Sequence, residues 1–194
     1  MAASSDKWNA RYRDHDGALP PAAEVLSGNL HLLPAQGEAL DLACGLGANA
    51  MLMAEQGLQV QAWDVANVAL DILQEQAAER GVLIDTQCRD VVGEGLPEAR
   101  FDVIVVSRFL ERILFAPLIN ALKPGGVIFY QTFTREKTGE SGPSNPNYLL
   151  AENELLRVFS GLRILAFRDE GRQGDTRRGL RNESWIVAKK EELR

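Results

Sequence analysis

The residues best suited to chemistry lie in one short stretch, Asp41-Leu-Ala-Cys-Gly-Leu-Gly47. An apolar run that predicts a strand precedes it at residues 38–42, and a helical pattern follows at residues 48–56. A glycine turn between strand and helix lets the backbone approach a ligand, and free N–H groups at the helix start point towards it. The pattern predicts a nucleotide site. Residues 45–50 also fit the G-x-G-x-x-G/A pattern of dinucleotide-binding proteins, so the turn alone does not identify the ligand.

Three aspartates fall where predicted strands end. Asp41 ends the first strand, Asp64 ends the second, and Asp90 follows the third. The carboxyl ends of parallel strands meet at one edge of a sheet, so these acids should lie near the glycine turn. Asp64 follows Gly45 at the separation where a carboxylate accepts hydrogen bonds from a ribose diol, and Asp90 is placed to meet an adenine amine. Each acid alone would more simply be a helix N-cap, but the three together favour nucleotide binding.

The elements that position these residues alternate between strand and helix. The predicted strands are residues 38–42, 58–63, 82–88, 101–106, 127–133, 162–167 and 183–188. The predicted helices are residues 5–13, 20–32, 48–56, 65–80, 108–122 and 151–159. This rhythm predicts an α/β, single-domain, doubly wound (Rossmann-like) fold with a seven-stranded, mostly parallel sheet. No helix separates the last two strands, so they should form a hairpin and make the last strand antiparallel.

The composition is that of a globular protein with one domain. The chain has 194 residues, of which 45% are hydrophobic and 25% charged. No apolar run approaches the ~18 residues of a membrane span, and the first residues lack the apolar segment of a secretory signal. We therefore expect a cytoplasmic protein without membrane contact. Cys44 and Cys88 lack metal-type spacing, so we expect two small buried side chains and no metal site.

Charge is distributed unevenly along the chain. The net charge of −6 disfavours general binding of polyanions. Residues 1–129 carry 9 Lys/Arg and 17 Asp/Glu, a balance of −8, whereas residues 130–194 carry 12 and 10, a balance of +2. Attraction for an anionic substrate should therefore come from the C-terminal third. One loop there is dense in arginine, with Arg172, Arg177, Arg178 and Arg181.

Five motifs, in order and spacing, resemble those of class I S-adenosylmethionine-dependent methyltransferases. They are Asp41-x-Ala-Cys-Gly-x-Gly, Ala62-Trp-Asp64, Arg89-Asp90, Phe101-Asp-Val-Ile-Val and Leu122-Lys-Pro-Gly-Gly126. The resemblance covers almost the whole chain and implies S-adenosyl-L-methionine as cofactor and S-adenosyl-L-homocysteine as product. Within this class the chain is most similar in pattern to the tellurite/thiopurine-resistance type, through residues 60–64, the short N-terminal helix and Glu154-Leu-Leu-Arg.

The resemblance also implies which residues hold the cofactor. Those matching residues 41–47 surround its methionine part, Asp64 binds the ribose, Asp90 binds the adenine, and backbone near Ser107 closes the methionine side. Together with Tyr12, discussed next, the expected cofactor-binding residues are Asp41, Ala43, Cys44, Gly45, Gly47, Asp64, Val65, Asp90, Val91, Ser107 and Tyr12.

Two segments outside these motifs are expected to complete the domain of residues 1–194. Trp8 and Tyr12 share one face of a predicted helix. They either staple this helix to the domain or help it close over the cofactor, so residues 1–34 are interpreted as an N-terminal helical cap. The polar, Gly- and Pro-containing segment at about residues 134–150 is long enough to be a substrate loop.

The acceptor of the methyl group is less well defined by the sequence. No catalytic residue is assigned: His15 fits an exposed turn, His31 a helix end and Glu111 a helix start. A soft or anionic nucleophile needs no general base, so we predict a small-molecule acceptor of that kind. An RNA or protein methyltransferase, a non-catalytic S-adenosylmethionine-binding domain and a nicotinamide-dependent oxidoreductase are the alternatives. Nucleic acid is disfavoured because the chain lacks a basic stripe interleaved with aromatic residues. The oligomeric state is not indicated.

Overall fold

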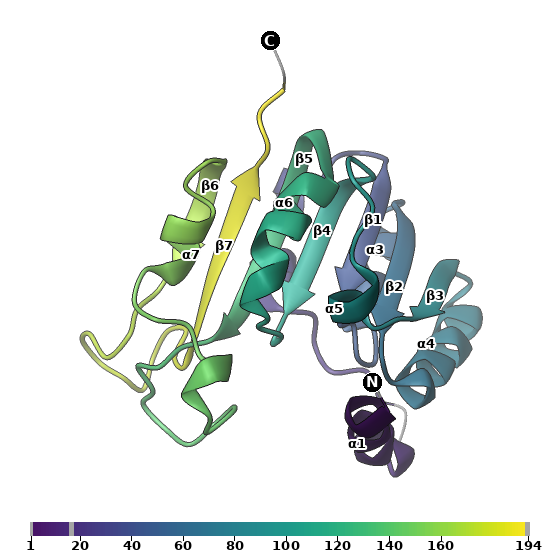
Figure 1. The fold of residues 1–194 in the computed structure, drawn as a ribbon, viewed down its shortest axis with the longest axis horizontal. Helices are drawn as coiled ribbons and strands as arrows, with labels where there is room; N and C mark the ends of the chain where they lie inside the picture. The colour runs from purple at the N-terminus through teal and green to yellow at the C-terminus, as the bar shows by residue number, and fades with distance from the viewer. Residues whose placement is uncertain (1, 16–17, 193–194) are drawn as a thin grey trace.

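The computed structural model describes residues 2–15 and 18–192, which form one seven-stranded sheet with helices on both faces (Figure 1). The strand order is β3-β2-β1-β4-β5-β7-β6. The strands are β1 (Glu38–Leu42), β2 (Gln59–Asp64), β3 (Ile84–Cys88), β4 (Phe101–Ser107), β5 (Leu122–Phe133), β6 (Arg163–Arg168) and β7 (Glu183–Lys189). Neighbours among β1 to β5 pair in parallel, while β7 is antiparallel to both β5 and β6. The predicted fold class, including the antiparallel last strand, is confirmed.

The helices divide between the two faces of the sheet. They are α1 (Ala2–Arg13), α2 (Glu24–Ser27), α3 (Ala48–Glu55), α4 (Asn67–Arg80), α5 (Val91–Glu94), α6 (Phe115–Ala121) and α7 (Glu154–Val158), with 3-10 turns η1 (Leu30–Leu32), η2 (Arg112–Leu114) and η3 (Pro146–Tyr148). One buried core joins the sheet to α2, α3 and α4, and a second joins it to α5, α6 and α7. Within the described residues no helix is long and apolar enough to cross a membrane.

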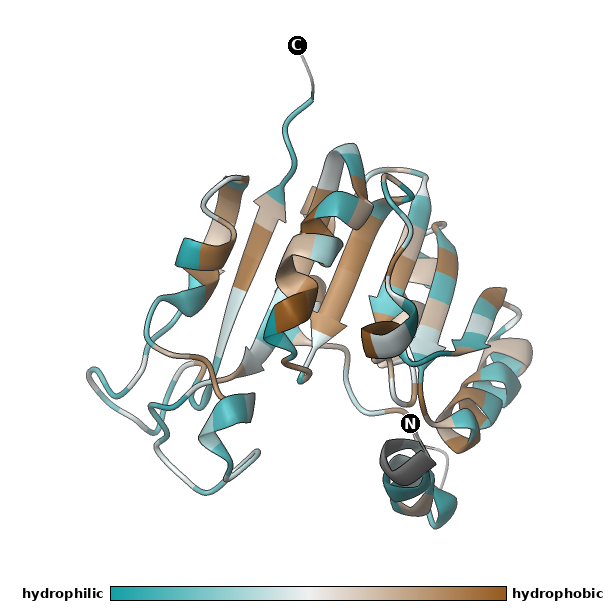
Figure 2. Cartoon of the chain, viewed as in Figure 1, coloured by the Kyte–Doolittle hydropathy of each residue, from teal (hydrophilic) through white to brown (hydrophobic). Residues whose placement is uncertain are grey.

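The central strands are rich in apolar residues, and β4 is mostly brown in Figure 2. In β4 the run from Val103 to Val106 is fully buried, with alternate residues in the two cores. Strands covered by helices on both faces read as nearly continuous apolar runs, which explains why β4 was recognisable. The same arrangement leaves the carboxyl edge of the parallel strands as the place where polar side chains gather. In Figure 1 this edge faces α1 on one side and the long loops after β5 and β6 on the other.

Two predicted helices are shorter than expected. The helix predicted at residues 20–32 is replaced by α2 and η1, because the chain is still extended at Ala23 and Gly28 caps α2. The helix predicted at residues 108–122 begins only at Phe115, after the turn η2. Pro117 accounts for this start, because it has no N–H to donate and is tolerated only in the first turn of a helix.

Two further elements differ from the sequence prediction. The short helix α5 directly after Asp90 was not predicted. Strand β5 begins at Leu122 rather than at residue 127, so the Lys-Pro-Gly-Gly motif lies inside the strand, with Leu122 paired to Phe101. The register shifts between Phe101 and Val103, and this irregularity accommodates the two glycines within the strand.

Candidate active site

The turn between β1 and α3 needs glycine both for its conformation and for space. Gly45 and Gly47 have φ angles of +53° and +75°, in the left-handed region that glycine tolerates. A Cβ atom on Gly47 would lie 2.4 Å from the Leu73 side chain of α4. One on Gly45 would lie 2.7 Å from the Tyr12 hydroxyl of α1. The turn is therefore closely packed against α1 and α4, and Ala43 shares its left-handed conformation, with φ of +54°.

Asp64 lies beside this turn at the end of β2. Its Oδ2 accepts a hydrogen bond from the Gly45 N–H at 2.8 Å, and its Oδ1 accepts one from the Ala66 N–H at 2.9 Å. Burial raises the pKa of Asp64, and the hydrogen bonds from Ala66 and Gly45 oppose that rise. An ionised carboxylate offers about four acceptor positions, so each oxygen retains capacity for one more donor. Neighbouring Val65 uses its carbonyl differently, as the acceptor of the Ser5 hydroxyl at 2.9 Å.

Asp41 is fully buried beneath the turn rather than open at its surface. Its Oδ2 accepts from the Ala50 N–H at 2.9 Å, and its Oδ1 lies 3.5 Å from the Asn49 amide nitrogen. Burial raises the pKa of Asp41 to about 7, although the hydrogen bonds from Ala50 and Asn49 act in the opposite direction. The side chain thus organises the first turn of α3, and its ionisation falls near neutral pH.

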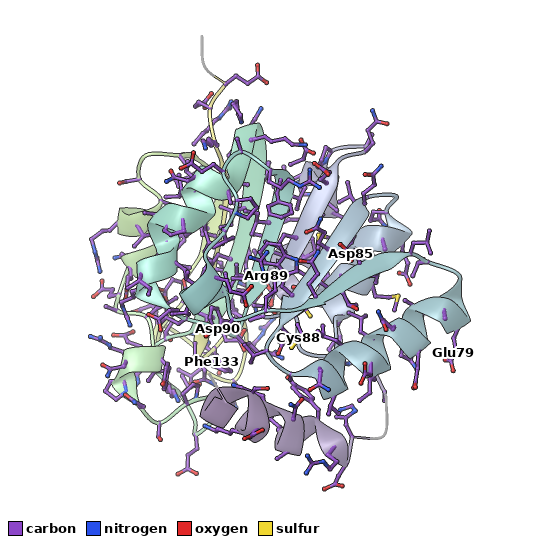
Figure 3. All side chains as sticks on the ribbon, turned by 45° about the vertical axis from the view of Figure 1, so that its right-hand side comes forward. Glu79, Asp85, Cys88, Arg89, Asp90 and Phe133 are labelled. Atoms are coloured by element: carbon purple, nitrogen blue, oxygen red, sulfur yellow. The ribbon has the colours of Figure 1, made fainter. Side chains whose placement is uncertain are left out.

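Asp90 is the N-cap of α5. Its Oδ1 accepts from the N–H groups of Val92 at 3.2 Å and Gly93 at 3.4 Å. Both interpretations of this acid therefore remain compatible with its position, because a cap that uses one oxygen leaves the other available to an amine donor. The side chain of Val91 is 7% exposed and belongs to the core, so any contact with a ligand there involves its backbone. Figure 3 shows Asp90 and Cys88 where β3 ends, on the side of α1.

Ser107 ends β4 and is linked to the glycine turn through Asn49. The Asn49 amide donates to the Ser107 hydroxyl at 2.9 Å and accepts from the Ala23 N–H at 2.9 Å. Asn49 is 4% exposed, so this one side chain joins the start of α3, the end of β4 and the segment before α2. It was not singled out from the sequence; the available signal was a polar residue in an apolar helix.

Helix α1 covers the glycine turn and the start of α4. Trp8 and Tyr12 stack with ring centroids 6.3 Å apart and pack against Leu46, with Ala66 and Ala69 alongside. Asn9 accepts a hydrogen bond from the Val68 N–H at 3.1 Å. Burial raises the pKa of Tyr12, and the nearby carboxylate of Asp64 adds to the rise. Helix α1 is thus stapled to the domain beside the glycine turn, and its closure over a cofactor stays a prediction.

A second polar cluster lies at the carboxyl edge of β4 and β5, and the sequence analysis missed it. The side chain of Gln131, 3% exposed, accepts from the Val25 N–H at 2.8 Å and donates to Glu183 at 2.5 Å. Arg108 completes the cluster, because its Nε donates to Glu183 at 3.1 Å and its backbone N–H donates to the Gln131 carbonyl at 2.8 Å. The available signal was Gln131, a polar residue within the apolar strand β5.

Arg112 holds the segment that follows β5 in place. Its guanidinium pairs with both carboxylate oxygens of Glu154, at 2.7 and 3.0 Å. It also donates to the carbonyls of Asn147 and Leu149. The segment predicted as a substrate loop at residues 134–150 is therefore anchored at its C-terminal end.

The arginine-dense loop after β6 uses much of its charge internally. Arg181 donates to the carbonyls of Arg178 and Gly171, among others, and Arg177 pairs with Asp175 at 2.9 Å. Arg172 donates to the Lys137 carbonyl at 2.9 Å. Arginine is thus mainly a cross-link within this loop, and the Arg178 side chain is the member without a hydrogen bond or ion pair among the described residues.

The two cysteines differ from each other. Cys44 is half-buried in the glycine turn, and burial raises the pKa of its thiol. Cys88 is exposed at the end of β3, so the expectation that it is buried is wrong. Strand β3 is an edge strand with little cover on one face, which explains the exposure. In the part of the chain that the structure describes, no three His, Cys, Asp or Glu side chains are grouped to hold a metal.

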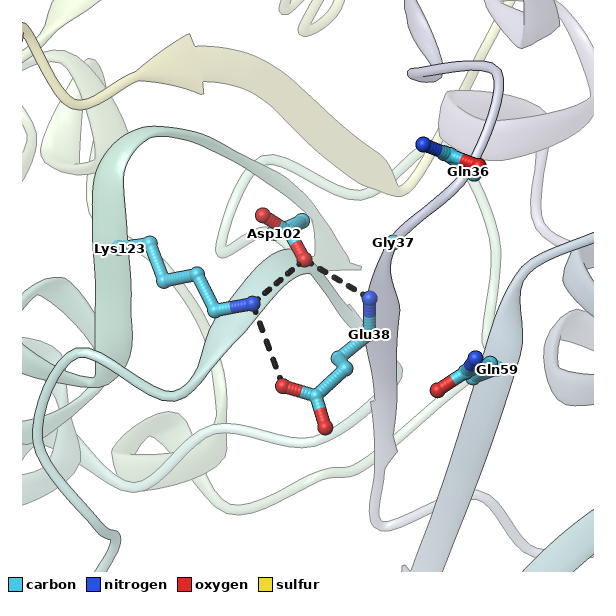
Figure 4. A pocket seen from close by; sticks show the side chains of 6 residues that line it. All are labelled: Gln36, Gly37, Glu38, Gln59, Asp102 and Lys123. Carbon is cyan, nitrogen blue, oxygen red and sulfur yellow. Dashed lines mark hydrogen bonds and ion pairs between the residues drawn. The ribbon is translucent and has the colours of Figure 1, made fainter.

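Two surface hollows lie at the opposite, amino edge of the sheet. Figure 4 shows one, a cavity of about 470 Å³, where Lys123 Nζ lies 2.8 Å from Asp102 and 3.2 Å from Glu38. Burial acts to raise the pKa of Asp102, but the hydrogen bonds from Lys123 and from the Glu38 backbone, with the charge of Lys123, together lower it. Lys123 of the fifth motif therefore supports the strand junction, far from the candidate cofactor residues. The candidate site lies at the other edge of the sheet, at the carboxyl ends of the strands, away from these hollows.

The residues at the carboxyl edge fit a nucleoside cofactor. The glycines at positions 45 and 47 leave no Cβ atom in the turn, and Asp64 keeps free acceptor positions beside it. Asp90 caps α5 two strands away from β1, in the order that the cofactor's methionine, ribose and adenine parts require. The structure thus brings together the turn, Asp64 and Tyr12, while Asp41 lies beneath them and Val91 in the core.

Comparison with known proteins agrees with this geometry. Residues 39–126 match the family described as "Methyltransferase domain". A "Ubiquinone biosynthesis O-methyltransferase" of Idiomarina loihiensis is 32% identical over 139 residues, covering 65% of this chain and 57% of that protein. The chain spans roughly three-fifths of the length of the curated relatives it matches.

Solved structures share the fold over nearly the whole chain. TehB from Haemophilus influenzae has 22% identity and a TM-score of 0.68, covering 96% of this chain and 67% of that one. A SAM-dependent methyltransferase from Aquifex aeolicus has 16% identity and a TM-score of 0.67, covering 93% and 97%. Identities this low establish the fold alone. Residues 39–126 are thus similar in sequence to a methyltransferase domain, and the chain shares its fold with solved SAM-dependent methyltransferases.

Proposed function

We propose that this protein transfers the methyl group of S-adenosyl-L-methionine to a small molecule. The observation that carries the proposal is Asp64, held by two backbone amides against the Gly45 turn with acceptor capacity left for a ribose diol. The match of residues 39–126 to a methyltransferase domain supports it. Because the chain spans only part of its curated relatives, the activity of the whole protein belongs to the proposal.

In the proposed mechanism the protein binds and orients, and the cofactor supplies an electrophilic methyl group on a sulfonium. Asp64 holds the ribose, residues 43–47 receive the methionine part, and Asp90 with the backbone of Val91 receives the adenine. Tyr12 and the rest of α1 cover the turn and exclude water. Methyl transfer is an in-line displacement, so its rate depends chiefly on positioning and on the electrostatics around the two reactants.

The acceptor proposed here is an anionic or soft nucleophile, which reacts without a general base. Two observations support an anion: the charge balance changes from −8 to +2 after residue 129, and Arg108 lies directly after the strand end at Ser107. The name of the Idiomarina relative favours oxygen as the attacking atom. The tellurite/thiopurine-resistance type stays a finer proposal, supported by the sequence resemblance.

Calorimetry tests the cofactor half of this proposal. We expect S-adenosyl-L-homocysteine to bind and NAD to show no measurable affinity; tighter binding of NAD would contradict the proposal. A turnover panel tests the acceptor half, following S-adenosyl-L-homocysteine formation with thiols, selenite or tellurite, small aryl carboxylates and bulk RNA. Bulk RNA as the sole methylated species would contradict the small-molecule assignment.

A further inference from the structure

The conformation of Arg108 is costly for an arginine. Its φ is +53°, in the left-handed region that non-glycine residues rarely occupy. Backbone strain of this kind persists only where surrounding structure enforces it, and it concentrates at functional sites. Here the bond from its backbone N–H to the Gln131 carbonyl continues the β4–β5 ladder for one residue beyond Ser107. The strain therefore places the Arg108 side chain at a defined point on the carboxyl edge.

A relay of buried groups fixes the guanidinium. Arg108 Nε donates to Glu183 Oε1 at 3.1 Å, and Glu183 Oε2 accepts from Gln131 at 2.5 Å. Gln131 in turn accepts from the backbone of Val25 at 2.8 Å. The Glu183 side chain is 10% exposed and both of its oxygens are engaged, so it positions Arg108 and is not available as a base. The side chains of Gln131 and Glu183, from two distant parts of the chain, are thus linked to one cation.

The free donors of Arg108 face solvent at this position. Its side chain is 57% exposed, and among the described residues no acceptor is bonded to its Nη1 or Nη2. By contrast, the guanidinium of Arg112 is hydrogen-bonded to Glu154 and to loop carbonyls, and Arg177 is paired with Asp175. The planar fork of arginine suits bidentate binding of an oxyanion.

We propose that Arg108 binds an oxyanion of the methyl acceptor, with Glu183 and Gln131 as the residues that position it. This inference rests on the proposed function, since it needs a methyl acceptor at the β4–β5 side of the cofactor. Two exposed apolar side chains, Ile113 and Tyr148, lie on segments that Arg112 ties together just after Arg108. An acceptor with an aromatic ring beside its oxyanion fits this combination of charge and apolar surface.

The test compares matched acceptors on the S-adenosyl-L-homocysteine complex. Calorimetry with 3,4-dihydroxybenzoate and with 4-methylcatechol, which lacks the carboxylate, is carried out on wild type, Arg108→Gly and Arg80→Gln. Glycine suits the left-handed conformation, which offsets the loss of the ion pair to Glu183, so Arg108→Gly should fold, and its Tm is measured with each titration. Arg80 is an exposed arginine with one ion pair at the far end of α4, and its replacement controls for loss of charge.

We expect wild type and Arg80→Gln to bind the dihydroxybenzoate at least about tenfold more tightly than the catechol, and Arg108→Gly to lose that preference. A second readout covers the case in which Arg108 holds the attacking phenolate: the pH of half-maximal turnover should then rise in Arg108→Gly for both acceptors. Absence of both effects overturns the inference. Failure of S-adenosyl-L-homocysteine to bind overturns the proposed function instead.

Discussion

The two halves of the carboxyl edge are built in different ways. The half around β1 and β2, where the methyl donor is proposed to bind, is called the donor half. There, carboxylates accept hydrogen bonds from backbone amides of nearby turns, as Asp64 does from Gly45. The half around β4, β5 and β7, where the methyl acceptor is proposed to bind, is called the acceptor half. There, Glu183 is hydrogen-bonded to the side chains of Gln131 and Arg108, which are 52 and 75 residues away in the sequence. The donor half therefore depends on local backbone geometry, whereas the acceptor half depends on the sheet bringing distant residues together.

This difference separates what each half can contribute. Backbone amides cannot be changed by substitution, so a turn built on them keeps its ligand through many changes of sequence. A cluster of side chains changes with each substitution and is suited to setting specificity. Substitutions in the donor half should thus alter stability and cofactor affinity. Substitutions in the acceptor half should alter only the affinity for the methyl acceptor.

The largest effect is expected from the buried acid of the donor half. Burial raises the pKa of Asp41 to about 7, against about 3.9 in an unfolded chain. A raised pKa in the folded state means that its stabilising contribution is complete below about pH 4 and lost as pH rises through about 7. The free energy of unfolding of wild type should fall relative to Asp41→Asn by about 1.4 kcal/mol per pH unit in this window. Urea unfolding of both proteins measures it, and a pH-independent difference would contradict the buried titration.

The glycine turn gives the next largest effect. Gly47→Ala places a Cβ atom 2.4 Å from Leu73 in a left-handed conformation, so we expect a loss of about 3 kcal/mol from strain and overpacking together. Gly57→Ala is the matched control, because Gly57 has φ of +89° with no atom near its Cβ position. It should lose only about 1–2 kcal/mol. Equal losses in chemical denaturation would show that packing against α4 is unimportant.

Asp64→Ala should separate affinity from folding. Two charge-assisted hydrogen bonds to the ribose, each worth roughly 1.5–3 kcal/mol, would be lost, so the Kd for S-adenosyl-L-homocysteine should rise about 100-fold. The fold should persist because Asp64 lies at a strand end. Calorimetry and circular dichroism together measure both quantities. A change in Kd below about threefold would reduce Asp64 to a cap of the turns at Gly45 and Ala66.

The smallest effect is expected from the arginine loop. Replacing Arg177 and Arg178 with alanine should raise the KM of an anionic acceptor by no more than about threefold, because exposed charges are screened within about 8–10 Å. Arg177 is already paired with Asp175. The variant should also weaken the salt dependence of the reaction while cofactor affinity stays constant. A KM change larger than that of Arg108→Gly would move the acceptor site from the β4–β5 edge to this loop.

The donor half could be predicted from sequence because its parts are local. The strand at residues 38–42, the glycines that follow it and Asp64 are all specified by short patterns of apolar and turn residues. The helix predicted at residues 108–122 was too long, but a local signal for its true start was present. Pro117 is tolerated only in the first turn of a helix and so fixes where α6 begins. The exposure of Cys88 was not predictable in this way, because it depends on the place of β3 at the sheet edge.

The contacts of the acceptor half could not be predicted because they form only between residues that are far apart in the sequence. Glu183 begins a strand that pairs with β5 at Phe133, and only this antiparallel register brings it to Gln131 and Arg108. The strand itself was predicted, but no pattern in the sequence announces the contact. The left-handed backbone of Arg108 was equally hidden, since arginine gives no sign of it.

The buried carboxamides of Asn49 and Gln131 impose an order on local opening of the N-terminal segment. Each accepts a backbone N–H of that segment, from Ala23 and Val25. Release of α2 would leave both buried carboxamides without these hydrogen bonds. The amide hydrogens of α2 should therefore exchange only on global unfolding. Helix α1 is held by partly buried hydrogen bonds and by the packing of Trp8 and Tyr12 on a small apolar cluster, and should exchange by local fluctuation. On the proposed function, opening of α1 alone would be enough for cofactor exchange, while the rest of the molecule stays folded around the site.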